Sequence, residues 1–131
     1  MNFALRVSKE IENLNMKKDM QGRYLNVGFS GGEKKKNEIL QLSILKPKLA
    51  MLDEVDSGLD VDAVHTVSEN IKAYHTEENA LILITHLNQL LKFIPPDVVH
   101  VLIDGRIVKE GGSDLVDVIE MNGFDAFRTE V

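Results

Sequence analysis

The sequence predicts an α/β layer fold, because two kinds of apolar pattern alternate along it. Residues 49–52 and 80–84 are short apolar runs that stop abruptly at polar residues, as fully buried parallel strands do. Residues 39–45 and 61–74 instead repeat their apolar side chains at helical spacing, which is typical of amphipathic helices. Strands that alternate with such helices are characteristic of α/β proteins.

Local signals predict where the first two helices begin and end. A helix is expected over 3–16, where apolar residues recur at steps of three and four: Phe3, Val7, Ile11 and Leu14. Residues 22–29 carry two glycines and no helical period, which favours a loop that delivers Ser30 to the start of the second helix. Pro47 should follow the end of that helix, because proline cannot donate a backbone hydrogen bond.

Two more helices are expected in the middle of the chain. Asp60 is a suitable cap for a helix with an apolar face made of Val61, Val64, Val67, Ile71 and Tyr74. Residues 87–94 are expected to form a short helix, which Pro95 and Pro96 stop.

The last third of the sequence predicts a hairpin followed by a helix. Asp104-Gly105 lies between the apolar segments 98–103 and 106–109, and both central residues of a type I′ turn need positive φ. Residues 111–113 should then lead into a helix that ends near Met121.

Composition limits the class of protein. At 131 residues the chain has room for one compact core, and 44% hydrophobic with 27% charged residues is ordinary for a globular domain. There is no cysteine, so the chain itself has neither a disulfide nor a thiolate ligand for an iron–sulfur cluster. The net charge of −6 opposes attraction to nucleic-acid phosphates, and no nucleic-acid partner is expected.

No segment predicts insertion into a membrane. The longest apolar run, 80–84, is far shorter than the roughly 20 residues of a transmembrane helix. The first residues do not show a basic segment followed by an apolar one, as a secretory signal would. A cytoplasmic location without direct membrane insertion is therefore expected.

Ser30-Gly31-Gly32-Glu33 has two interpretations. Ser30 with Glu33 three residues later fits a capping box, which satisfies two backbone amides at a helix start. A cap alone does not require two glycines, whereas bare backbone amides at a helix N-terminus can bind phosphate. The sequence is compatible with both interpretations.

Asp53 and Glu54 follow the first apolar run directly. Adjacent carboxylates at this position repel each other, which lowers stability unless they bind a cation or take part in a proton transfer. In phosphoryl transfer one such carboxylate holds Mg²⁺ and a neighbour orients the attacking water. An exposed acidic loop is the alternative.

Three further features allow both an ordinary and a functional interpretation. Residues 56–60 suit a turn and a helix cap. His86 ends the second apolar run, where it could be merely structural or could sense a phosphate. Residues 34–36 are three lysines, which fit a solvated helix face or a local attraction for nucleotide. The remaining histidines, His65, His75 and His100, lack ligand-like spacing and are expected to be structural.

The order of these features resembles that of ABC-type ATPases. Residues 30–33, Asp53-Glu54, 57–60 and Thr85-His86 are similar to the signature motif, the Walker B motif, the D-loop and the H-switch of that family. Together they carry the resemblance, because each motif alone is weak.

Three segments are specifically similar to SufC, the ATPase of iron–sulfur cluster assembly: 26–40, 52–60 and 96–102. The resemblance implies a P-loop NTPase fold, represented here by the C-terminal half of its parallel-sheet core with part of its helical subdomain. It further implies one partial domain, with the helical portion and signature motif in 1–46 and the core portion in 47–131.

The resemblance assigns roles in ATP hydrolysis. Glu54 would be the general base toward the attacking water, His86 would sense the γ-phosphate, and Asp53 would hold Mg²⁺. The remaining site residues would act across a dimer that forms on ATP binding. They are the phosphate-contacting Ser30, Gly31 and Gly32 and the communicating Ser57 and Asp60.

The implied function is that of the ATP-binding and ATP-hydrolysing subunit of the SUF machinery, with scaffold proteins of the SufB and SufD type as partners. A nucleotide-binding subunit of a membrane transporter is the alternative, and a non-catalytic piece that acts only in trans is another.

One motif of the family is missing. A P-loop needs Gly-x-x-x-x-Gly-Lys-Ser/Thr, and Gly28 to Lys34 offers glycines and a lysine at the wrong intervals. The family's Q-loop and adenine-stacking strand are missing as well. We therefore expect a fragment, with one part of a split protein or the product of a damaged reading frame as the alternatives. It should have unpaired strand edges and an uncovered apolar sheet face, and be inactive by itself in ATP hydrolysis.

Overall fold

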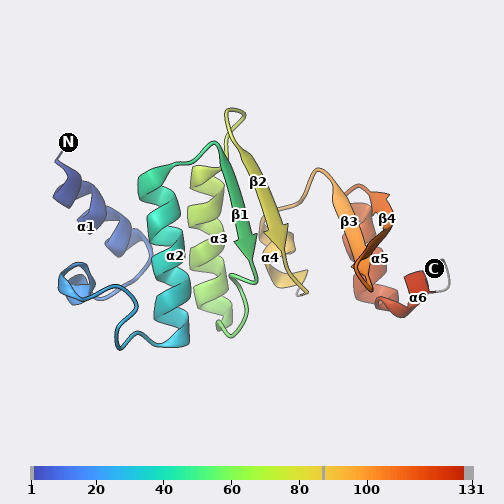
Figure 1. The fold of residues 1–131 in the computed structure, drawn as a ribbon, viewed down its shortest axis with the longest axis horizontal. Helices are drawn as coiled ribbons and strands as arrows, with labels where there is room; N and C mark the ends of the chain where they lie inside the picture. Colours follow the sequence, from blue (N-terminus) through green and yellow to red (C-terminus); the bar gives the residue numbers. More distant parts are fainter. Residues whose placement is uncertain (1, 87, 129–131) are drawn as a thin grey trace. The chain divides into compact units, whose positions relative to one another are not determined.

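Helices and a pair of parallel strands form the first of two compact units, Met1–Leu90 and Leu91–Val131 (Figure 1). The computed structural model describes residues 2–86 and 88–128. The first unit contains, in chain order, α1 (Phe3–Asn13), the 3₁₀ helix η1 (Lys18–Gly22), α2 (Gly31–Leu45), β1 (Leu49–Asp53), α3 (Val61–Tyr74) and β2 (Ala80–Ile84). The predicted α/β alternation is confirmed.

The predicted helix starts follow from their caps. Ser30 and Asp60 are the N-caps of α2 and α3, and each side chain accepts a backbone N–H in the first turn. Helix α2 ends at Leu45, and its C-cap Lys46, directly before Pro47, has a positive φ of 46°. Helix α1 ends at Asn13, three residues before the predicted end, and η1 was not predicted.

Helices α1, α2 and α3 lie on one side of the two strands (Figure 1). Their packing buries Ile11, Ile39 and Ile71 almost completely. A hydrogen bond of 2.7 Å from the Tyr74 hydroxyl to the Pro47 carbonyl joins the end of α3 to the segment after α2. Val61 was predicted in the apolar face of α3, but it is 66% exposed because it occupies the first helical position beside the cap.

Strands β1 and β2 pair in parallel, as predicted, but they are not fully buried. Ala50 pairs with Leu81 and is 5% exposed, whereas the next pair, Met51 and Ile82, is 65% and 44% exposed. Pairs alternate between the two faces of a sheet, and the helices cover only one face. The expectation of fully buried strands is therefore wrong for this chain, while the expected uncovered apolar face is present.

The second unit is built on a hairpin. Strands β3 (Val99–Ile103) and β4 (Arg106–Gly111) are antiparallel, and Asp104 and Gly105 have φ of 49° and 75°, as a type I′ turn requires. Helix α5 (Asp114–Asn122) contributes Leu115 to a core with Val101, Ile103 and Phe127, the last from α6 (Asp125–Arg128). Helix α6 was not predicted, and β4 extends two residues beyond the predicted strand.

Helix α4 (Asn88–Phe93) is the short helix expected before the two prolines. Its predicted first residue, Leu87, lies outside the described residues. Among the residues that the structure describes, no helix has the length and apolar character needed to cross a membrane.

Candidate functional site

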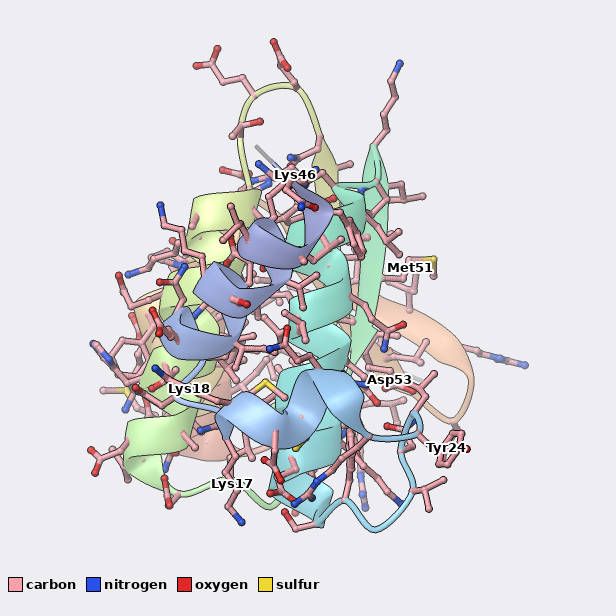
Figure 2. All side chains as sticks on the ribbon, turned by 90° about the vertical axis from the view of Figure 1, so that its left-hand side faces the viewer. Lys17, Lys18, Tyr24, Lys46, Met51 and Asp53 are labelled. Atoms are coloured by element: carbon pink, nitrogen blue, oxygen red, sulfur yellow. The ribbon has the colours of Figure 1, made fainter. Side chains whose placement is uncertain are left out.

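Asp53 is the last residue of β1 and stands on the uncovered face of the sheet. Its strand partner is Ile84, the last residue of β2, which is 51% exposed. The alternation of β1 puts Asp53 on the same face as Met51. In Figure 2 both side chains lie on the side of β1 away from α1, and Asp53 is exposed. The carboxylate is therefore open to a ligand at the carboxyl end of a parallel strand pair, where ligands bind in open α/β sheets.

Glu54 continues the strand by one hydrogen bond and then turns. Its N–H donates to the Ile84 carbonyl at 2.8 Å, but its φ is +47°, a conformation that residues other than glycine seldom adopt. Its Oε1 lies 3.1 Å from Nδ1 of His86, and the two side chains are 50% and 57% exposed. The structure thus brings the two predicted catalytic residues together in solvent, where such a contact contributes little to stability.

The loop after Glu54 is tightly folded. The N–H of Ser57 donates to the Glu54 carbonyl at 3.1 Å, and Gly58 has a φ of +74°, which suits glycine. Asp60 Oδ1 accepts the N–H of Ala63 at 2.8 Å and so begins α3. The capping interpretation of Asp60 is therefore confirmed, while its role across a dimer stays a prediction, as does that of Ser57.

Asp56 has an environment that the sequence did not predict. It is 2% exposed, and its two carboxylate oxygens lie 3.2 Å and 3.0 Å from the hydroxyl of Thr85, which follows β2. In the sequence, Asp56 directly follows the apolar Val55, which is also buried. An acidic residue after a single apolar one does not by itself predict that the acidic residue is buried.

Ser30 forms the predicted capping box at the start of α2. Its Oγ accepts the N–H of Glu33 at 3.2 Å, and its own N–H donates to Glu33 Oε2 at 2.9 Å. A hydroxyl oxygen that accepts in this way still has its O–H to donate to a ligand. The cap is confirmed, and the phosphate-binding interpretation is compatible with it.

The two glycines after Ser30 differ in their surroundings. A Cβ added at Gly31 would meet nothing within 4 Å, so the fold itself does not require glycine there. A Cβ added at Gly32 would lie 3.4 Å from the Leu59 side chain. The start of α2 and the loop before α3, two of the predicted motifs, are therefore neighbours within this chain.

Charge also gathers at the start of α2. The Ser30 N–H donates to the Glu33 carboxylate, and this hydrogen bond lowers the pKa of Glu33. Burial opposes the shift by a smaller amount, and the nearby positive charge of Lys17 adds to it. Lys17 Nζ lies 3.7 Å from Glu33 Oε1. The sequence did not indicate that Lys17 would reach this site.

The site has carboxylates suited to a hard cation. Within the described ranges, no group of three or more His, Asp or Glu side chains is placed to hold a metal ion by itself. Mg²⁺, however, typically takes one or two carboxylates and completes its shell with water and substrate phosphate oxygens. Asp53, exposed at the strand end with Glu54 beside it, fits that donor set.

Comparison with solved structures shows which fold this is. An ATP-binding cassette of an ABC transporter, in its ADP conformation, superposes with a TM-score of 0.65 at 20% identity over 98% of this chain and 49% of that chain. An ATP-binding subunit of an ABC transporter gives 0.67 at 23% identity over 98% and 53%. The fold is that of an ATP-binding cassette. No family model matches the sequence.

Two of three sequence relatives carry names of the same kind. Vegetative protein 296 of Bacillus subtilis is 49% identical over 100% of this chain and 50% of its own length. The probable ATP-dependent transporter ycf16 of Antithamnion is 48% identical over 95% and 50%, and a probable ABC transporter ATP-binding protein of Streptococcus pyogenes is 48% identical over 94% and 48%. The chain thus spans about half the length of the curated relatives that it matches.

Proposed function

We propose that this chain is part of the ATP-hydrolysing subunit of a cytoplasmic iron–sulfur cluster assembly machinery. The observation that carries the proposal is the Glu54–His86 contact of 3.1 Å beside Asp53, at the carboxyl ends of two parallel strands of a cassette fold. The SufC-like segments 26–40, 52–60 and 96–102 support the choice of machinery.

The chemistry at this end of the sheet is attack of water on the γ-phosphorus of ATP, with ADP as the leaving group. Glu54 accepts the proton of the attacking water, and His86, 3.1 Å from Glu54, binds a γ-phosphate oxygen through a ring N–H. Asp53 would hold Mg²⁺, which when bound neutralises charge on the phosphate oxygens. The exposure of all three side chains supports access by a ligand.

The start of α2 would serve the nucleotide of a second subunit. Ser30 has its O–H to donate, and Gly31 presents a bare backbone to solvent. Gly32 lies against Leu59, so movement of the loop that carries Ser57 and Asp60 would displace the start of α2, where the signature motif lies. This contact supports communication across an ATP-bound dimer.

The segment that grips the phosphates would be supplied from outside this chain. The sequence has no P-loop spacing, and the chain spans half of its relatives' length. The uncovered face of β1 and β2, which carries Asp53, is the natural place for that segment to pack. Scaffold proteins of the SufB and SufD type would be the partners of the whole subunit.

The direct test joins this chain to a P-loop lobe, such as the portion of the Bacillus subtilis relative outside the match, and measures ATP hydrolysis. Glu54→Gln should lower turnover by about 10²- to 10⁴-fold, the usual value of general base catalysis. Glu78→Gln, an exposed carboxylate in the turn after α3, is the control and should change nothing. Turnover indifferent to Glu54→Gln would end the proposal.

A subunit of a membrane transporter is the second candidate, favoured by the relatives named as ATP-dependent transporter and ABC transporter ATP-binding protein. The hydrolytic residues would be the same, so partners distinguish the two functions. Capture of a polytopic membrane protein, without a cluster scaffold, would favour the transporter.

A third candidate is a non-catalytic piece that offers Ser30, Gly31 and Gly32 to a complete subunit. It is favoured by the absence of P-loop spacing from the sequence. Calorimetry with MgATP should then detect no binding to this chain alone and some binding in a mixed dimer. Tight binding by the chain alone would contradict both this candidate and our explanation of the missing P-loop.

A further inference from the structure

Asp56 is a buried carboxylate that the proposed chemistry does not use. It is 2% exposed, and among the described residues no Lys, Arg or His forms an ion pair with it. Removing a charged carboxylate from water costs several kcal/mol unless hydrogen bonds compensate. The Thr85 hydroxyl, at 3.0 Å and 3.2 Å from its two oxygens, is the compensating side chain.

The position of this pair connects it to the site. Asp56 lies two residues after Glu54, and Thr85 directly precedes His86. The same two segments are also joined by the Glu54 N–H to Ile84 carbonyl bond and by the Glu54–His86 contact. Both side chains of the Glu54–His86 contact are about half exposed to solvent. In the Asp56–Thr85 contact, by comparison, the Asp56 side chain is buried.

Glu54 needs such support, because its φ of +47° is unfavourable for a residue with a side chain. Local strain of this kind persists only where the surroundings hold it. A link from the buried Asp56, two residues after Glu54, can do so, while the exposed Glu54–His86 contact exchanges readily with water.

We propose that Asp56 and Thr85 form a positioning clamp that holds Glu54 in its left-handed conformation and within reach of His86. This inference rests on the proposed function, since it gives Asp56 and Thr85 a role in setting the geometry of the general base. Neither residue touches the nucleotide in this account.

The first test is amide hydrogen exchange on the purified chain. Thr85→Val removes the hydroxyl but keeps the shape, and it should speed exchange of the Glu54 N–H about tenfold, the equivalent of one net hydrogen bond. Thr85→Ser should restore slow exchange. Ser68→Ala is the matched control, because it removes a different hydroxyl, which is buried and donates to the Val64 carbonyl at 2.7 Å, and it should leave Glu54 unchanged.

Unchanged exchange at Glu54 in Thr85→Val, or an equal change in Ser68→Ala, would overturn the clamp. If Thr85→Val does not fold, Asp56→Asn provides the measurement, because it keeps the shape and one acceptor oxygen. Its neutral acceptor makes a weaker bond, so exchange at Glu54 should rise by roughly threefold, and no rise would likewise overturn the clamp.

The joined protein separates this inference from the proposed function. Thr85→Val should lower kcat with little change in KM, and Thr85→Ser should restore kcat. If Glu54→Gln abolishes turnover and Thr85→Val has no effect, the clamp is wrong and the function stands. If Glu54→Gln has no effect, the function is wrong, and hydrogen exchange still decides the clamp.

Discussion

The two faces of the β1–β2 sheet are both apolar in sequence but differ in the structure. On one face Ala50 is 5% exposed beneath the helices, while on the other Leu49, Met51 and Ile82 are between 44% and 65% exposed. Parallel strands occur almost only in sheets that are covered on both faces. The sequence of the two strands is therefore suited to a sheet covered on both faces, and the described helices of the first unit cover one of them.

The uncovered face is also the face of the candidate site, because Asp53 stands on it. A polypeptide that covers Met51 would therefore come close to the proposed magnesium ligand.

The largest expected effect on stability comes from placing a charge on the covered face of the sheet. Ala50→Lys would bury an unpaired charge, so we expect the free energy of unfolding to fall by about 3 kcal/mol or more. Met51→Lys, one residue away on the exposed face, should change it by no more than about 0.5 kcal/mol. Chemical denaturation of both variants measures the contrast, and equal losses would mean that the two faces do not differ as described.

A smaller effect is expected from loosening the helix that begins after Ser30. Ser30→Ala removes the side-chain half of the capping box and should cost about 1 kcal/mol of unfolding free energy. Ser113→Ala is the matched control, since Ser113 precedes α5 without a side-chain cap bond. A cost as large at Ser113 as at Ser30 would argue against a specific cap.

The smallest effect concerns pH. The pKa of Glu33 is lowered in the folded chain, so its stabilising contribution is complete at neutral pH, above the ordinary glutamate value of about 4.3. It is lost only as the pH falls through the lower folded pKa. The Ser30 amide should report this step in an NMR titration, and Glu33→Gln, which can still accept from Ser30, should abolish it. A midpoint above the ordinary value would contradict the assignment.

Features set by local chemistry could be predicted from the sequence. The caps at Ser30 and Asp60 and the Asp104-Gly105 turn depend on a few neighbouring residues, and all three are where the sequence placed them. The grouping of Glu54 with His86 was predictable only through the resemblance, because the two are far apart in sequence.

Features set by distant parts of the molecule could not be predicted. The exposure of Met51 depends on which elements cover the sheet, and an apolar strand looks the same with or without its cover. The burial of Asp56 and the positive φ of Glu54 depend on how the loop closes against Thr85. Helix α6 is only four residues long, too short for a periodic pattern.

The most direct test of the central claim is a double-mutant cycle on ATP hydrolysis in the joined protein, using Glu54→Gln, His86→Ala and their combination. If the 3.1 Å contact makes the two side chains one catalytic unit, the double variant should be little slower than the slower single variant. Effects that multiply independently, or no loss of turnover in any of the three, would contradict the account.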